Sequence, residues 1–208
     1  MRDNNVISDA VIKRMPKYYS QLKLLDEKGV SKVSSSTLAN MLGITASQVR
    51  QDFYNFGGFG QQGYGYDVKN LKKEITQILG LDQTYNMIVV GAGHIGRALS
   101  GYVGFAKEGF EIKAMFDINV TDSEYNGVPI YHTSQLEKYL SENKIDFAVI
   151  ATQASAAIEV ANEIVRLGIK NIWNFAPIDI KLPGDVVIEN ISMSESLFVL
   201  SYRAKNRN

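Results

Sequence analysis

The chain has 208 residues, 45% hydrophobic and 21% charged, which is typical of a globular protein with one large domain or two small ones. It has no cysteine and two histidines, which excludes disulfides and thiolate zinc sites and argues against a histidine-rich metal centre. Carboxylate sites for magnesium stay open as an alternative, although no metal site is expected. It also lacks the run of about 18 apolar residues that spans a membrane, which predicts a cytoplasmic protein with no membrane partner.

The net charge of zero conceals an uneven distribution. Residues 1–80 carry 11 Lys and Arg against 7 Asp and Glu, whereas residues 81–208 carry 11 against 15. A basic first part and an acidic second part indicate two domains with different partners, and nucleic acid suits the basic one. A chance distribution of the charges is the simpler alternative, so charge alone does not establish a nucleic-acid partner.

The first 56 residues predict helices. Pro16 fits the first turn of a helix that ends at Gly29, with a short helix before it. Ser and Thr residues then offer N-caps for two further short helices, which are joined through Gly43. This pattern predicts a helix-turn-helix, although spacing alone fits a plain helical hairpin equally well.

The second helix of this pair, over residues 46–56, has a polar face. Val49 and Phe53 are expected to seal it against the first helix, which leaves polar side chains outside. Such side chains reach phosphates and base edges when a helix enters the major groove. From this region we expect DNA contacts by Ser35, Ser47, Gln48, Arg50, Gln51 and Asn55.

A glycine-rich stretch follows at residues 56–66, where glycine alternates with aromatic and amide residues. We interpret it as the hairpin of a winged helix, whose tip at Gln61, Gln62 and Gly63 enters the minor groove. A flexible aromatic linker is the alternative. A closing helix over residues 68–79 would complete the domain.

The stretch from residue 85 to residue 99 is an apolar strand, a glycine-spaced turn and a helix. In the pattern G-x-G-x-x-G, Gly91 makes the turn, Gly93 admits a pyrophosphate and Gly96 lets helix and strand pack closely. The next strand ends in Asp117, whose carboxylate accepts from ribose hydroxyls and repels a 2′-phosphate. This context favours NAD(H) over NADP(H) and over a strand-turn-helix without a ligand.

Strands and helices alternate through the second part, which predicts an α/β fold with a parallel Rossmann-type sheet. Further strands are expected at residues 127–131, 147–152 and 170–175. Ser134 with Glu137 suggests a capping box for the helix after the first of these. The strand ends near Thr152 and Asn174 should line the ligand crevice.

The last helix, which Ser192 would cap, is strongly apolar and must dock on its own sheet or on a second subunit. The predicted organisation is therefore a winged-helix domain at residues 1–80, a Rossmann domain at 81–190 and a terminal helix at 191–208.

An enzyme would need features beyond a nucleotide-binding fold. A dehydrogenase usually adds a substrate domain and an acid or base against the substrate, and His94 and His132 are better explained as structural residues. We therefore expect no catalytic residues and a nucleotide that acts as a signal. An NAD-dependent oxidoreductase and a DNA-binding sensor of another nucleotide, such as coenzyme A, stay open as alternatives.

Five motifs together resemble the Rex family of redox-sensing transcriptional repressors over nearly the whole chain. They are Arg14-Met15-Pro16 with Tyr18 or Tyr19, Val49-Arg50 with Asp52 and Phe56-Gly57, Gly63-Tyr64-Gly65-Tyr66, the turn at Gly91 to Gly96, and Asn174-Phe175-Ala176-Pro177. The resemblance implies a homodimer that binds a palindromic double-stranded operator and is released when NADH binds, whereas NAD+ competes with NADH without releasing the protein. It also implies that the terminal helix is exchanged between subunits.

The same resemblance implies where the redox state is read. It places Tyr102 and the start of the terminal helix, at Ser192 and Met193, beside the nicotinamide, with Arg14 reaching Tyr102 as a switch. The expected cofactor-binding residues are Gly91, Ala92, Gly93, His94, Ile95, Gly96, Asp117, Ile118, Thr152, Asn174, Tyr102 and Met193, and the switch residues are Arg14, Tyr102 and Ser192.

The chain departs from the family pattern in three places. Many relatives have a basic residue where this chain has Gln51, and a serine-tyrosine pair where it has Tyr54-Asn55. Relatives also often have an acid and an aromatic residue where this chain has Ser192-Met193. Because glutamine pairs well with adenine and arginine with guanine, we predict an operator half-site altered at one base pair, with Arg50 still reading G.

Overall fold

The computed structural model describes residues 7–57 and 65–207, and the chain forms two compact units, Met1–Gln83 and Thr84–Asn208. Within the described residues, no helix is both long enough and apolar enough to cross a bilayer.

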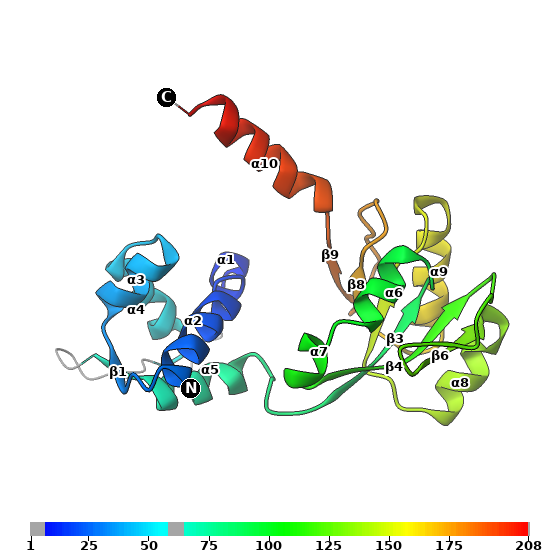
Figure 1. Cartoon of the computed structure of the whole chain (residues 1–208), viewed down its shortest axis with the longest axis horizontal. Helices are drawn as coiled ribbons and strands as arrows, with labels where there is room; N and C mark the ends of the chain where they lie inside the picture. The colour runs from blue at the N-terminus through cyan, green and yellow to red at the C-terminus, as the bar shows by residue number, and fades with distance from the viewer. Residues whose placement is uncertain (1–6, 58–64, 208) are drawn as a thin grey trace. The chain divides into compact units, whose positions relative to one another are not determined.

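The first unit is mostly helical (Figure 1). It also contains one small antiparallel sheet among its described residues. Its helices are α1 (Asp9–Ile12), α2 (Met15–Glu27), α3 (Ser35–Leu42), α4 (Ala46–Asn55) and α5 (Val68–Ile78). Strand β1 (Lys32–Val33) pairs with β2 (Tyr66–Asp67). The tip of the expected wing, Gln61, Gln62 and Gly63, lies outside the described residues. Strand β2 follows the expected wing in the sequence and pairs with β1, which lies between α2 and α3 in the sequence.

Local capping explains why α3 and α4 begin and end where they do. The Ser34 hydroxyl accepts the Thr37 N–H at 3.0 Å, and the Thr45 hydroxyl accepts the Gln48 N–H at 3.1 Å. Gly43 ends α3 in the left-handed conformation, with φ of 67°. The helix-turn-helix predicted from the sequence is confirmed.

Apolar side chains from all the longer helices meet in the core of this unit. Phe53 from α4 is buried between Tyr18, at a ring-centroid distance of 4.8 Å, and Tyr66, at 5.1 Å. Val49 is fully buried one turn before Phe53, so this face of α4 seals the hairpin as expected. The opposite face of α4 is thereby left to solvent.

The second unit contains a seven-stranded sheet in the order β5-β6-β4-β3-β7-β8-β9. All pairings are parallel except that of β5 with β6. The strands are β3 (Tyr85–Val90), β4 (Phe110–Asp117), β5 (Glu124–Tyr125), β6 (Val128–His132), β7 (Phe147–Ile150), β8 (Asn171–Asn174) and β9 (Val187–Asn190). The helices are α6 (His94–Ser100), α7 (Gly104–Lys107), α8 (Leu136–Glu142), α9 (Ala154–Arg166) and α10 (Met193–Lys205), with a 3-10 turn at Thr133–Gln135.

Helices cover both faces of this sheet, which explains why its central strands are apolar throughout. Alternate residues such as Ile88 and Phe116 pack with α8 and α9, whereas Val89 and Met115 face the side of α6. The Rossmann-type parallel sheet predicted from the sequence is confirmed.

Two details differ from the expectations, and a third agrees with them. Helix α7 and strands β5 and β9 were not predicted, since each is short and lacks an apolar run such as that of β7. The capping box expected at Ser134 with Glu137 is wrong, because the His132 ring accepts the Ser134 N–H and Gln135 accepts the His132 N–H. Helix α10 begins after Ser192, whose hydroxyl accepts the Glu195 N–H at 3.4 Å, as the sequence suggested.

Candidate nucleotide and nucleic-acid sites

The glycine turn between β3 and α6 is closed tightly at two of its glycines. A Cβ on Gly91 would lie 2.5 Å from the Ala151 carbonyl oxygen, and one on Gly96 would lie 1.9 Å from the Gly91 oxygen. Gly91 also has a φ of 106°, which disfavours any side chain. At Gly93, in contrast, a Cβ would meet nothing within 4 Å, so the space above this residue is open. Gly91 and Gly96 therefore shape the turn, and Gly93 leaves it accessible.

Asp117 lies at the end of β4, directly beside this turn. Its Oδ2 accepts the Ala92 N–H at 2.7 Å, and its Oδ1 accepts the Asn119 N–H at 2.8 Å. These two backbone donors fix the carboxylate while leaving each oxygen a further lone pair. The arrangement holds a hydrogen-bond acceptor and a negative charge at the mouth of the turn.

A pocket of about 390 Å³ opens over the carboxyl ends of β3, β4 and β7. Five of the predicted cofactor residues line it: Gly91, Gly93, Asp117, Ile118 and Thr152. The lining that sequence reasoning missed is Val90, Phe116, Asn119, Thr133, Ala151, Gln153, Ser155, Ala156 and Val160. These residues belong to the strand ends and the loops after them, to the 3-10 turn after β6 and to the first two turns of α9, and only the fold brings them together.

The Thr152 hydroxyl makes this pocket a candidate ligand site. Among the side chains of the described residues, its Oγ1 is the buried polar atom that has no hydrogen-bond partner. An unsatisfied buried hydroxyl costs free energy, and such a group in a native protein calls for an explanation. A bound polar ligand would supply the missing partner. The closed turn, the open space at Gly93 and this hydroxyl together fit a nucleotide.

The other predicted cofactor residues lie in different places. Ala92 is buried and uses its N–H on Asp117, while His94 and Ile95 form the first turn of α6. Tyr102 is exposed and lines a separate pocket beside α7. Met193 is exposed at the start of α10.

The expectation for Asn174 needs correction. Its side chain is fully buried, and it donates to the Ile178 oxygen at 2.7 Å and to the Asn190 side chain at 2.8 Å. It also accepts the Ala176 N–H at 3.0 Å. Since both amide hydrogens are used inside the protein, Asn174 braces the loop after β8 rather than facing a ligand.

The exposed face of α4 carries most of the predicted DNA contacts. Ser47, Arg50, Gln51 and Asn55 are all exposed, and Arg50 donates to the Ser35 hydroxyl at 3.2 Å. A polar, solvent-facing second helix is the arrangement by which helix-turn-helix proteins read the major groove. Tyr54, which was not predicted as a contact, is also exposed on this helix.

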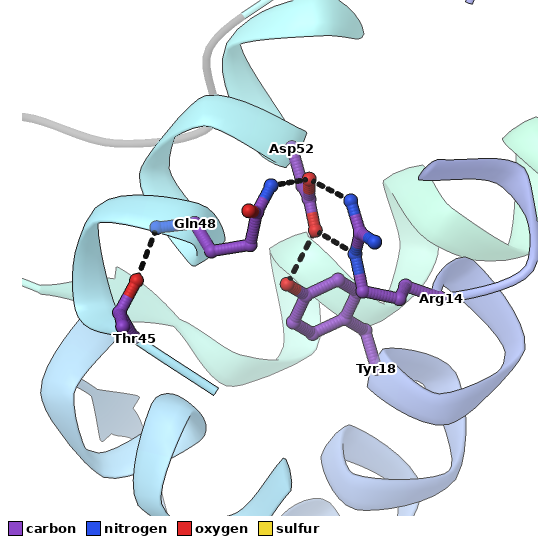
Figure 2. A network of polar contacts seen from close by, with 5 residues as sticks. All are labelled: Arg14, Tyr18, Thr45, Gln48 and Asp52. Carbon is purple, nitrogen blue, oxygen red and sulfur yellow. Dashed lines mark hydrogen bonds and ion pairs between the residues drawn. The ribbon is translucent and has the colours of Figure 1, made fainter. Parts of the chain in front are cut away.

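Gln48 differs from these residues. It is half-buried, and its amide nitrogen donates to Asp52 Oδ1 at 2.9 Å (Figure 2). The expectation that Gln48 simply faces outward is therefore wrong. Sequence reasoning placed Asp52 in a family motif without a role, because nothing local indicates its partners.

Asp52 is the centre of a buried polar network. Arg14 donates two hydrogen bonds of 2.7 Å to it, through Nε to Oδ2 and through Nη2 to Oδ1, and the Tyr18 hydroxyl donates to Oδ2 at 2.8 Å (Figure 2). Burial alone would raise the pKa of Asp52, but the hydrogen bonds from Arg14, Gln48 and Tyr18 and the Arg14 charge lower it overall. Burial and the bond to Asp52 raise the pKa of Tyr18. Asp52 is thus an anion whose four acceptor positions are filled.

The predicted switch residues are found in both units. Arg14 is held by Asp52 in the first unit, and Tyr102 lies in the second. Ser192 caps α10. A link from Arg14 to Tyr102 therefore stays a prediction, whereas the contact of Arg14 with Asp52 was not foreseen.

A helix-turn-helix unit joined to a Rossmann unit that has a pocket at the carboxyl ends of its strands defines a DNA-binding protein that responds to a nucleotide. Comparisons with known proteins support this class. Residues 6–53 match a family model described as a putative DNA-binding protein N-terminus, and residues 82–178 match one described as a CoA binding domain.

Full-length relatives identify the family. The chain is 48% identical over 207 residues to the redox-sensing transcriptional repressor Rex of Clostridioides difficile strain 630, covering 99% of each chain. It is also 48% identical to the Rex repressor of Clostridium novyi strain NT, covering 97% of each. The chain belongs to the Rex family of redox-sensing transcriptional repressors.

Solved structures give the same result. The Rex-family repressor RSP in complex with β-NAD+ and operator DNA is similar with a TM-score of 0.91 and 46% identity, covering 97% of this chain and 94% of that one. RSP in complex with β-NADH is similar with a TM-score of 0.88 and 43% identity, covering 97% and 95%.

Proposed function

We propose that this protein is a transcriptional repressor that binds a palindromic operator as a homodimer and leaves it when NADH binds. The observation that carries this proposal is the presence, in one chain, of an exposed recognition helix and a nucleotide pocket that contains an unsatisfied hydroxyl. The full-length similarity to Rex repressors and to RSP with operator DNA supports it. The ratio of NADH to NAD+ would then set the expression of genes for fermentation and respiration.

The exposed side chains of α4 read the operator. Arg50 reads guanine, whose O6 and N7 accept from a guanidinium, and Gln51 reads adenine through N6 and N7. Ser35, Ser47 and Asn55 bind the phosphate backbone of the DNA, and residues 61–63 contact the minor groove. The operator half-site therefore differs by one base pair from that of relatives with a basic residue at position 51.

The pocket holds the adenosine part of NADH or NAD+. Asp117 accepts from the ribose hydroxyls, Thr152 supplies its buried hydroxyl, and the backbone at Gly93 approaches the pyrophosphate. The negative charge of Asp117 disfavours a ribose with a 2′-phosphate. Bound here, the nucleotide acts as a signal, since its two redox forms differ in charge and ring planarity only at the nicotinamide.

The nicotinamide end meets a different set of residues. We assign to it Tyr102, Met193 and Ser192, with His94 and Ile95 at the first turn of α6 nearby. Arg14 carries the response toward α4. A ligand shifts such an equilibrium only by its different affinity for the two states, so NADH must favour the arrangement that does not fit the operator.

A second subunit completes the molecule. Helix α10 has 13 residues and none of them is buried within one chain, although Leu197, Phe198 and Leu200 are apolar. A partner chain would cover this surface, and a palindrome requires two recognition helices. The repressor acts on chromosomal DNA, which puts it in the bacterial cytoplasm.

No catalytic role is assigned. His94 is exposed at the start of α6, and His132 caps the turn before α8, so each has a place in the fold that needs no chemistry. Within residues 7–57 and 65–207, no group of three His, Asp or Glu side chains could hold a metal ion. The relatives are named as repressors rather than enzymes.

Coenzyme A is the second candidate ligand, because residues 82–178 match a family model of that description. Calorimetric titrations of NADH, NAD+, NADPH and coenzyme A into the protein decide between these ligands. We expect binding of NADH and NAD+ and little binding of NADPH or coenzyme A, whose riboses carry phosphates that face Asp117. Preferential binding of coenzyme A would overturn the assignment of NADH.

The DNA part of the proposal is tested by selecting duplexes from a random pool with the purified protein. We expect a palindrome whose half-site contains a guanine that Arg50→Ala no longer selects, with the loss of roughly tenfold in discrimination at that base pair. Selection of no duplex, or of the same sequence by both proteins, would contradict the proposal.

A further inference from the structure

Gln48 occupies a position that should matter for base reading. It lies in the first turn of α4, where its N–H is bonded to the cap residue Thr45. The N-terminal residues of a recognition helix are the ones that contact base edges. Yet the Gln48 side chain is half-buried and bonded to Asp52, which sets it apart from its exposed neighbours on the helix.

The contact with Asp52 fixes the orientation of the Gln48 amide. An ionised carboxylate only accepts hydrogen bonds, so the nitrogen end of the amide must face Asp52 and the oxygen end must face away. Gln48 Oε1 has no partner within the described part of the chain, and one amide hydrogen is left. An acceptor beside a donor is the pair with which glutamine reads N6 and N7 of adenine.

The same carboxylate is controlled by Arg14, which lies 38 residues away in sequence at the start of α2. Arg14 bonds to both carboxylate oxygens, and the Asp52 side chain has no exposed surface. Loss of the guanidinium would leave a buried anion with fewer donors than it needs. Gln48 and Tyr18 are its other partners and would have to move to compensate.

We propose that Asp52 is a positioning residue that holds the Gln48 amide in the orientation for reading one base pair, and that Arg14 sets this orientation through the Asp52 carboxylate. This inference rests on the proposed DNA-binding function. It gives Arg14 an effect on sequence preference that its distance along the chain from α4 does not suggest. The base contact belongs to Gln48, and Asp52 acts through it.

The test compares operator affinities of the full-length protein and its variants Gln48→Met, Asp52→Asn and Arg14→Lys. Each is titrated with the selected operator and with duplexes that change one base pair at a time. We expect Gln48→Met to lose roughly tenfold discrimination at a single base pair. Asp52→Asn and Arg14→Lys should weaken discrimination at that same base pair and leave it unchanged elsewhere. The double variant of Gln48→Met with Asp52→Asn should lose no more there than Gln48→Met alone.

Gln51→Ala is the matched control, because Gln51 is exposed on the same helix and makes no bond to Asp52. It should change discrimination at a different base pair, and its effect should add to that of Asp52→Asn. Circular dichroism and thermal melting establish that each variant is folded. If Asp52→Asn does not fold, the double-variant cycle of Gln48→Met and Arg14→Lys tests the same coupling.

Equal weakening of all duplexes by folded Asp52→Asn or Arg14→Lys, with an unchanged pattern of preference, would mean a merely structural network and overturn the inference. Equal weakening by Gln48→Met would assign Gln48 to the phosphate backbone, with the same consequence. In both cases the wild-type protein still binds its operator and the proposed function stands. Failure of the wild-type protein to bind any selected duplex would overturn both.

Discussion

At the scale of single residues, a substitution at Thr152 should lower the affinity for the ligand without lowering the stability of the protein. Its buried hydroxyl lacks a partner, so Thr152→Val removes an unsatisfied polar atom and replaces it with a methyl of similar size. We expect the variant to be as stable as the wild-type protein or up to about 1 kcal/mol more stable. Its affinity for NADH should fall by roughly tenfold, since the hydrogen bond to the ligand is lost. Thermal melting and calorimetry measure the two effects, and reduced stability with unchanged affinity would contradict the assignment.

Asp52 gives the protein a component of stability that depends on pH. Its pKa in the folded protein is lowered, so this component is complete above the unfolded pKa of about 4 and is lost as the pH falls through the folded pKa. Asp52→Asn should cost roughly 2 to 4 kcal/mol at pH 7, because the partly exposed Arg14 loses its partner. Urea unfolding should show this difference constant above about pH 5 and shrinking below about pH 4. A difference that stays constant down to pH 3 would be inconsistent with an ionised, paired Asp52.

At the scale of elements, two glycines of the turn between β3 and α6, Gly93 and Gly96, should respond differently to substitution by alanine. Gly93→Ala meets open space and an ordinary backbone angle, so the variant should fold with nearly wild-type stability. The added methyl would occupy the space into which the pyrophosphate fits, and NADH binding should fall by at least about tenfold. Melting curves and NADH titrations are the measurements.

Gly96→Ala is the matched comparison for this prediction. Its Cβ would lie 1.9 Å from the Gly91 oxygen, so helix and strand must separate. We expect a loss of stability of about 1 to 3 kcal/mol. Should Gly93→Ala bind NADH as tightly as the wild-type protein does, the nucleotide would not approach this turn as proposed.

The elements also show what the sequence could predict. Helices α3 and α4 were predictable because their signals are local: Ser34 and Thr45 cap them and Gly43 separates them. The parallel sheet was predictable from the alternation of apolar strands and helices. Short elements such as α7 and β9 were not, since neither has an apolar run like that of β7 to mark it.

The site was predictable only where it depends on a contiguous motif. The glycine turn and Asp117 follow from spacing along the chain, and both line the pocket. Gln48 and Asn174 were misjudged because their amides are bonded to residues that no local pattern connects with them. A helical period gives the direction of a side chain but not the partner that holds its end.

At the scale of the whole molecule, helix α10 should determine assembly. Leu197 exposes 63% of its surface and Leu200 exposes 60%, three positions further along the same side of the helix. Leu197→Glu would put a charge into the dimer interface, so we expect monomers in sedimentation velocity and a loss of at least about tenfold in operator affinity. Tyr202→Glu adds the same charge on the opposite side of α10, where the Tyr202 side chain is also exposed, and is the control. A dimeric Leu197→Glu protein with full operator affinity would exclude this side of the helix from the interface.

The central claim is that one molecule converts nucleotide redox state into DNA release. The most direct measurement is the fluorescence anisotropy of a labelled palindromic operator, first bound by the protein and then titrated with NADH in an excess of NAD+. We predict a return of the anisotropy to that of free DNA as NADH is added, and no change when the same amount of NAD+ replaces it. An operator complex that survives saturating NADH would contradict the account.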